Sequence, residues 1–183
     1  MLLSLEVLAT IFGLVQGITV LLNKRSNWIF YIAQMLCLIF FALCKKLYGD
    51  FLNACIYLIL GVVGWFVWNE KVDLKITKCC LKEKLIYIIL IVLGTLMLYI
   101  MLRQTTDPLP LMDSFTTISS FVATYYMLRK KIDTWIIWFI NDICYIVQYA
   151  LLPQPAYYLL VLNIVWTIMA VCSYIYWQKQ MVK

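Results

Sequence analysis

Seven long apolar runs separated by short polar segments make up the chain, and this pattern limits the folds open to it. Each run has roughly 15 to 22 residues, and a helix rising about 1.5 Å per residue needs about 20 residues to cross the apolar core of a bilayer. The runs lie at Leu2–Leu22, Trp28–Cys44, Phe51–Trp68, Leu85–Leu102, Ser114–Leu128, Thr134–Leu152 and Ala156–Trp177. The sequence therefore predicts an all-α integral membrane protein with seven transmembrane helices.

Composition supports a membrane rather than water as the solvent. Hydrophobic residues make up 65% of the chain, charged residues 13%, and the mean hydropathy is +0.91. Soluble domains are about 45–50% apolar. The first run lacks the basic start and small-residue cleavage site of a signal peptide, so we expect a retained helix. Transmembrane β-strands would show alternating segments of about ten residues, which these runs do not resemble.

The fifth run, Ser114–Leu128, is shorter and richer in Ser and Thr than the others. Its polar side chains need protein neighbours, because lipid offers them no hydrogen-bond partners. We therefore expect this helix to be buried among the others.

Charge predicts the orientation. With seven spans, twelve of the fifteen Lys and Arg residues fall on the side of the C-terminus and three on the other side. Positive residues accumulate in cytoplasmic loops. The C-terminus is thus predicted in the cytoplasm and the N-terminus outside. The net charge of +6 needs no nucleic-acid partner.

An internal repeat is visible in the aromatic and amide residues. The second run opens Asn27-Trp28 and continues to Gln34, while the sixth opens Thr134-Trp135 and continues to Asn141. Sliding runs 1–3 onto runs 5–7 leaves the fourth as a connector. This pattern predicts two parallel three-helix bundles, residues 1–68 and 114–183, joined by a basic loop and linker helix at 69–113. In such repeats the substrate site lies between the halves.

Asp142 is the leading candidate for a functional residue, because an ionisable group deep in a membrane helix costs about 2.5–3.5 kcal/mol on insertion scales. A helical period places aromatic and amide side chains on one broad face around it. They are Trp135, Trp138, Asn141, Tyr145, Gln148 and Tyr149. Flat aromatic surfaces, amides and one carboxylate suit a planar ring with a polar appendage, and a cationic ring gains cation–π attraction. The alternative is a structural Asp bonded to a neighbouring helix, with Trp135 as an interfacial anchor.

Other helices offer further candidates. Asn163 and Trp166 share a stripe of the last run, and Gln34, Asn53 and Tyr57 lie in the first half. Each could line the substrate site or bond to a neighbouring helix.

Several chemistries are not indicated. The chain has no His, and its seven Cys do not form a metal-binding pattern. It has no Gly-rich phosphate loop and no nucleophile paired with a base. We expect neither an enzyme nor a bound cofactor or metal.

Two segments resemble the PnuC family of nicotinamide riboside transporters. Residues 110–120 read PLMDSFTTISS, and residues 129–142 read RKKIDTWIIWFIND, which contains the Trp-x-x-Trp-x-x-Asn signature of the family. In the first half, Leu5-Glu6, the sequence LYGD at 47–50 and GWFVW at 64–68 agree. The resemblance covers essentially the whole chain.

The resemblance implies a bacterial inner-membrane protein with a fold similar to SWEET sugar transporters, a homotrimer, and facilitated diffusion of nicotinamide riboside. A kinase would trap the substrate inside for NAD biosynthesis. It also implies that Trp135, Trp138, Asn141 and Asn163 bind substrate, with Gln34 a weaker match. The chain departs from the pattern at Tyr31, where a second Trp pair is lacking.

Two alternatives remain from the sequence. Thiamine carries a thiazolium ring and would suit the same aromatic and acidic face, so a thiamine uniporter of the same family is one. The other is a substrate-binding subunit of an ATP-driven vitamin importer, although such subunits usually have six spans.

Overall fold

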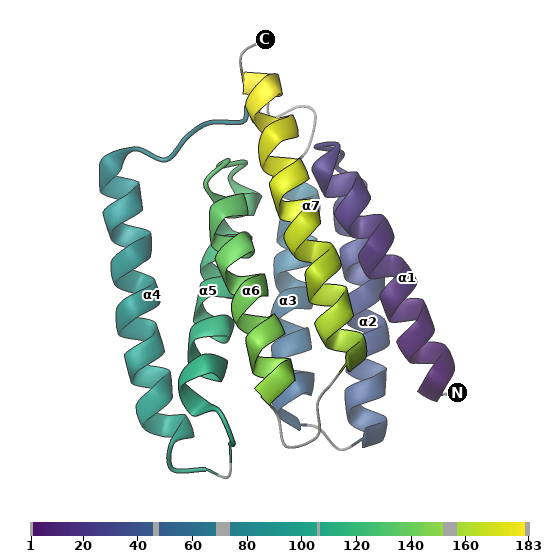
Figure 1. Cartoon of the computed structure of the whole chain (residues 1–183). Coiled ribbons are helices and arrows are strands. Elements are labelled where there is room, and N and C mark those ends of the chain that lie inside the picture. The colour runs from purple at the N-terminus through teal and green to yellow at the C-terminus, as the bar shows by residue number, and fades with distance from the viewer. Residues whose placement is uncertain (1, 46–47, 69–73, 106, 152–156, 182–183) are drawn as a thin grey trace. The chain divides into compact units, whose positions relative to one another are not determined.

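Seven α-helices form the described part of the computed structural model, which comprises residues 2–45, 48–68, 74–105, 107–151 and 157–181. The helices are α1 (Leu2–Leu21), α2 (Asn27–Lys45), α3 (Tyr48–Val67), α4 (Leu81–Leu102), α5 (Pro110–Leu128), α6 (Thr134–Leu151) and α7 (Tyr157–Met181). Figure 1 colours them in chain order, from purple at the N-terminus to yellow at the C-terminus. The prediction of an all-helical chain with seven helices is confirmed.

Four helices begin before the apolar runs that predicted them: α2 by one residue, α3 by three, and α4 and α5 by four each. Helix α4 starts at Leu81, four residues early, because the Cys80 backbone N–H donates to the Glu83 carboxylate (2.9 Å) and so caps the first turn. Helix α5 starts at Pro110, also four residues early. Proline suits a first helical position, where its missing N–H would have no helical partner.

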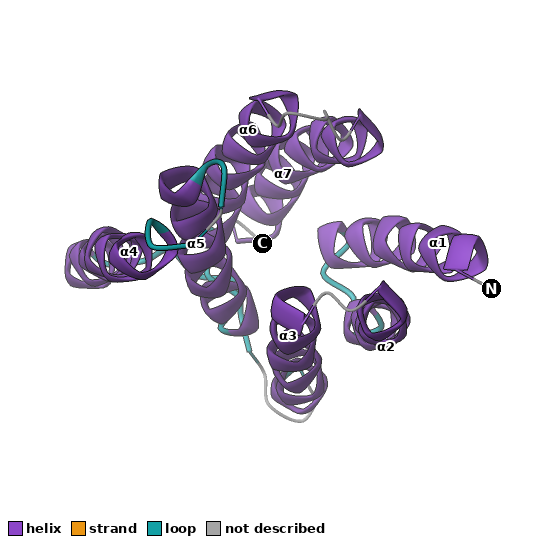
Figure 2. Ribbon diagram, turned by 90° about the horizontal axis from the view of Figure 1, so that it is seen from below, coloured by secondary structure: helices purple, strands orange, loops and turns teal. Residues whose placement is uncertain are grey.

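The chain divides into two compact units, residues 1–74 and 75–183. In the first, α2 packs against both α1 and α3. In the second, α6 packs against α5 and α7, and α4 packs against α5 alone. Figure 2 views the helices along their length and shows α6 between α5 and α7. Within each unit the middle helix of a triplet therefore has two protein neighbours.

The repeat predicted from sequence is visible in the backbone and in the burial of α2 and α6. Two non-glycine residues have positive φ angles, Asn23 at 55° and Lys130 at 49°, and they are 107 positions apart. The same offset relates buried residues of the two helices. The pairs are Asn27 and Thr134, Trp28 and Trp135, Gln34 and Asn141, and Met35 and Asp142.

Helices α3 and α7 match at an offset of 109. Among the described residues, positions 54, 61 and 64 of α3 and position 68 directly after it are buried. On α7 the buried positions are 163, 170, 173 and 177. In each unit the last of these is a Trp whose ring meets a Trp of the middle helix edge to face. The centroids of Trp28 and Trp68 are 5.5 Å apart, and those of Trp135 and Trp177 are 5.2 Å apart. The two triplets thus share one internal packing plan.

Helix α5 carries a buried polar face, as its sequence predicted. Nine of its residues are buried, including Ser114, Thr116, Ser119, Ser120 and Thr124. Its position between α4 and α6 explains how this face is covered. The prediction that α5 is shielded by neighbours is confirmed.

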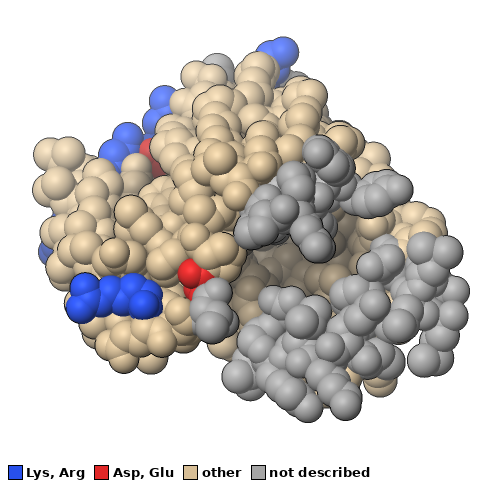
Figure 3. Space-filling view, turned by 60° about the horizontal axis from the view of Figure 1, so that its bottom comes forward, with Lys and Arg blue, Asp and Glu red and all other residues tan. Residues whose placement is uncertain are grey.

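Helix α4 is apolar and mostly exposed, in contrast to α5. It and the segment Leu160–Met181 are the two described stretches that pass a strict test of length and hydropathy for a membrane span. Close contact with α5 occurs at Gly94, where an added Cβ would lie 2.9 Å from Ile118. Figure 3, with the bottom of Figure 1 turned forward, shows few Lys, Arg, Asp and Glu side chains on the described surface.

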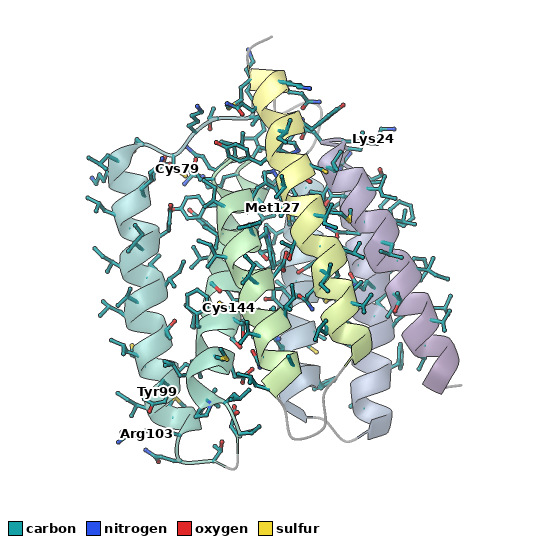
Figure 4. All side chains as sticks on the ribbon, viewed as in Figure 1. Lys24, Cys79, Tyr99, Arg103, Met127 and Cys144 are labelled. Atoms are coloured by element: carbon teal, nitrogen blue, oxygen red, sulfur yellow. The ribbon has the colours of Figure 1, made fainter. Side chains whose placement is uncertain are left out.

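A short arm before α4 is joined to the α5–α6 loop. Thr77 exchanges backbone hydrogen bonds with Lys130 and Ile132 (3.1 and 2.9 Å). The buried Asp133 carboxylate accepts from the Cys79 backbone N–H (2.7 Å) and pairs with Lys84 (3.2 Å). Figure 4 shows Cys79 at the end of the second unit opposite Arg103. We call residues 75–80, with these partners, the arm clasp.

The arm clasp changes the surroundings of a thiol outside the helices. Burial, helped by the neighbouring Asp133 carboxylate, raises the pKa of Cys79 to about 12. In the sequence, Lys84 counted among the basic residues that predict the orientation. The structure adds an ion pair with Asp133 for Lys84, and Lys131 pairs with Glu83 (2.9 Å).

Candidate functional site

Helix α6 presents two polar seams, one to each neighbouring helix. At 100° per residue, Thr134, Asn141 and Gln148 form one line, and Trp135 and Asp142 form a second line. The first seam faces α5, as its hydrogen bonds show. The second line begins at Trp135, whose ring packs against Trp177 of α7. All five side chains are buried.

The seam between α5 and α6 is a ladder of hydrogen bonds. Ser119 Oγ donates to Asn141 Oδ1 (2.7 Å), and Thr116 Oγ1 donates to Gln148 Oε1 (3.3 Å). Gln148 Nε2 in turn donates to Asp113 Oδ1 (3.3 Å), in the first turn of α5. The ladder fixes the amide groups of α6, because α5 holds one end of the Asn141 amide and both ends of the Gln148 amide.

Asn141 and Asp142 lie at the middle of this face with unused bonding capacity. Asn141 is fully buried, and its Nδ2 has no hydrogen-bond partner among the described residues. Asp142 is 2% exposed, and no other described residue bonds to its carboxylate. A buried donor without a partner costs about 1–3 kcal/mol. Such adjacent groups, one donor and one acid, are suited to a polar ligand.

The two predicted Trp residues of α6 have different surroundings. The Trp135 ring is 6% exposed and packs on Trp177, in the arrangement that Trp28 repeats in the first unit. Trp138 is half-buried and packs against a small cluster that includes Ala123 and Tyr126. The ring of Trp138 thus leaves more of its surface uncovered by the described chain than that of Trp135 does.

The remaining candidates of the second unit lie on α6 and α7. Tyr145, one turn beyond Asn141, is half-buried, and the side chain of Tyr149 lies outside the described residues. On α7, Asn163 is 4% exposed, and its backbone carbonyl accepts from Thr167 Oγ1 (2.7 Å). Trp166 is half-buried on the same helix.

The first unit holds its candidates on α2 and α3. Gln34 is buried and reaches α1, where a Cβ added to Gly13 would lie 2.6 Å from its Nε2. The rings of Tyr57 and Tyr31 meet edge to face at 6.2 Å. Asn53, one turn before Tyr57, is half-buried. The structure thus brings Tyr57 onto α2, whereas Gln34 contacts α1.

Sequence reasoning missed the α5 side of the ladder. Thr116 and Ser119 were interpreted only as a reason for burial, although their spacing already placed both hydroxyls on one helix face. The partners could not be chosen from sequence, because several helices carry amides. No group of three His, Cys, Asp or Glu side chains that could hold a metal occurs among the described residues.

A helical bundle with apolar outer surfaces and a buried row of amides, hydroxyls and one acid belongs to the class of polytopic membrane transport proteins. Residues 3–179 match the family model described as nicotinamide mononucleotide transporter. The chain belongs to this family of PnuC transporters. It is a multi-pass membrane protein, and the prediction of a PnuC family transporter is confirmed.

Individual PnuC transporters also resemble this chain. A nicotinamide riboside transporter PnuC from Neisseria mucosa is 24% identical, over 93% of this chain and 70% of the relative. The PnuC of the same description from Escherichia coli is 25% identical, over 80% of this chain and 74% of the relative. A crystal structure of the vitamin B3 transporter PnuC matches with a TM-score of 0.79 and 22% identity, over 97% of this chain and 82% of that one. All are named as transporters, in agreement with the prediction that the chain is not an enzyme.

Proposed function

We propose that the chain carries nicotinamide riboside across the membrane by facilitated diffusion and that phosphorylation inside the cell traps it for NAD biosynthesis. The observation that carries the proposal is the buried pair on α6, an amide nitrogen without a partner in the described chain beside an acid. Nicotinamide riboside combines a pyridinium cation with an amide and hydroxyl groups. The names of the relatives support the same substrate.

The proposed contacts follow from the chemistry of each group. Asp142 attracts the ring charge, and a ring face such as that of Trp138 adds cation–π attraction of about 0.5–2 kcal/mol. Amides bind the polar appendages of the substrate, with Asn141 first among them. The other proposed lining residues are Trp135, Tyr145, Gln148, Asn163 and Trp166 in the second unit and Gln34, Asn53 and Tyr57 in the first.

Charge also favours the riboside over the mononucleotide that the family description names. Recognition of a phosphate usually involves Arg or Lys. No Lys or Arg occurs in the stretches 47–70, 85–102, 104–128 and 132–178 of the sequence. A mononucleotide phosphate would instead lie in the field of Asp142. We therefore expect an unphosphorylated substrate.

Calorimetry on the purified protein tests the substrate. We expect micromolar or tighter binding of nicotinamide riboside, at least a hundredfold weaker binding of nicotinamide mononucleotide, and none of thiamine. Binding of thiamine alone would transfer the chain to a thiamine branch of the family. Equal binding of the mononucleotide would refute the charge argument.

A flux assay tests the mechanism. Liposomes that contain only this protein should take up labelled nicotinamide riboside down its gradient without ATP, and internal kinase with ATP should increase accumulation. A strict need for an added ATPase subunit would instead support the importer-subunit alternative. We also propose a homotrimer, as the family resemblance implies, and native mass spectrometry of the detergent-solubilised protein measures the number of chains.

A further inference from the structure

Ser119 is a fully buried hydroxyl near the middle of α5. Its Oγ lies 2.6 Å from the Phe115 carbonyl oxygen of its own helix and 2.7 Å from Asn141 Oδ1 of α6, and these two acceptors share its single proton. It is therefore a contact between α5 and the buried amide of the candidate site.

Other hydroxyls of α5 show what is particular to Ser119. Ser114 is also fully buried and bonds to the Pro110 carbonyl oxygen at 2.6 Å, the same bond to the preceding turn. Thr124 does the same to Ser120 (2.9 Å). Neither reaches α6 in the hydrogen bonds of the described chain. Ser114 thus reproduces the burial and local bond of Ser119 without the link to Asn141.

The link determines which end of the Asn141 amide is available. An amide carries an acceptor at one end and two donors at the other, and rotation by 180° exchanges them. With Oδ1 bound to Ser119, Nδ2 is the end left buried without a partner in the described residues. A buried donor of this kind is satisfied when a ligand supplies an oxygen acceptor.

We infer that Ser119 is a positioning residue, which holds the Asn141 side chain so that its Nδ2 donates to a carbonyl or hydroxyl oxygen of the transported molecule. This inference rests on the proposed function for the identity of that molecule. Ser119 itself touches Asn141 and not the substrate. Its effect on binding therefore passes through the Asn141 amide alone.

A double-mutant cycle tests that route. Ser119→Ala should weaken binding of nicotinamide riboside by about three- to tenfold, the range expected for one hydrogen bond. Ser114→Ala is the matched control and should leave the affinity unchanged, and Ser119→Thr, which keeps a hydroxyl, should recover most of the loss. In the Asn141→Ala background, Ser119→Ala should have no further effect.

Three results would overturn the inference. They are an unchanged affinity in Ser119→Ala, an equal loss in Ser114→Ala, and a Ser119→Ala loss that persists in the Asn141→Ala background. Two analogues locate the acceptor. The effect of Ser119→Ala should vanish for the analogue that lacks the bonded oxygen, either the carboxamide-free riboside or the deoxyriboside.

Amide NMR tests the positioning without any substrate, and so separates its failure from failure of the proposed function. The chain contains six Asn residues, so selective ¹⁵N labelling gives few side-chain signals, and Asn141→Ala identifies the relevant pair. Ser119→Ala should shift or broaden this pair, and Ser114→Ala should not. An unmoved signal in Ser119→Ala would refute the positioning role even if the wild-type protein binds nicotinamide riboside.

Discussion

Asp142 and Met35 occupy equivalent positions on the middle helices of the two units, and both are buried. The acid therefore replaces an apolar side chain at a site where packing alone would suffice. Replacing a buried acid by an isosteric amide usually leaves stability unchanged or raises it, because the charge no longer needs to be desolvated. Loss of the negative charge should instead weaken the binding of a cationic ligand.

For Asp142→Asn we expect affinity for nicotinamide riboside to fall tenfold or more, about 1.4 kcal/mol or above, with no loss of thermal stability. Calorimetry and thermal unfolding in detergent measure the two quantities. Met35→Leu is the control at the equivalent position and should bind normally. Wild-type affinity in Asp142→Asn would assign a structural role to this acid.

Gly64 and Ser173 are a second equivalent pair, and they differ in tolerance to a side chain. A Cβ added to Gly64 would overlap the fully buried Trp28 ring. Gly64→Ala should thus destabilise the protein by about 1–3 kcal/mol, the usual cost of overpacking. Ser173→Ala removes a buried hydroxyl that has no partner among the described residues and should be neutral or stabilising. Thermal unfolding of both variants measures these effects, and equal stability of the two variants would contradict the packing argument.

At the scale of elements, the Asp133 carboxylate within the arm clasp connects α4 to the start of α6. The Asp133 side chain is 5% exposed, whereas Lys84 is 43% exposed. Asp133→Ala should therefore cost about 1.5–3 kcal/mol, since it leaves the Cys79 N–H without its charged acceptor. Lys84→Met should cost clearly less, because exposed ion pairs contribute little. The two unfolding midpoints in detergent test this order.

The clasp also predicts the reactivity of two adjacent thiols. Because the pKa of Cys79 is about 12, little thiolate is present at pH 8, and the thiol is buried as well. Cys80 is exposed. In the Cys80→Ser variant, a maleimide should label position 79 slowly at pH 8, and Asp133→Ala should accelerate labelling. Fast labelling of Cys79 in the intact clasp, followed by peptide mass spectrometry, would show that the arm is open in solution.

Element types and most helix ends could be predicted from the sequence, because a long apolar run in a bilayer is expected to form a helix. The starts of α4 and α5 were placed late, since Glu83 and Pro110 act through local geometry that hydropathy ignores. In the candidate site, the face around Asp142 followed from helical period. The bond from Ser119 to Asn141 did not, because choosing among buried amides requires the packing of α5 against α6.

For the whole molecule, the unequal distribution of Lys and Arg between the loops predicts the orientation of the chain in the membrane. Twelve of fifteen basic residues lie on the side of the C-terminus. A C-terminal fluorescent protein fusion should therefore be bright, because the reporter matures in the cytoplasm, and a C-terminal alkaline phosphatase fusion should be inactive. The reverse pattern would invert the predicted topology.

The shared packing plan of the two units has unlike chemistry at its contacts. In the first unit three glycines make room for side chains of the middle helix: Gly13 for Gln34, Gly61 for Tyr31 and Gly64 for Trp28. In the second, hydroxyls bond to amides across the α5–α6 seam. A comprehensive mutational scan should therefore give two different signatures on one scaffold. Tolerance should follow side-chain volume at the glycine contacts of the first unit and donor or acceptor identity along the α5–α6 seam of the second.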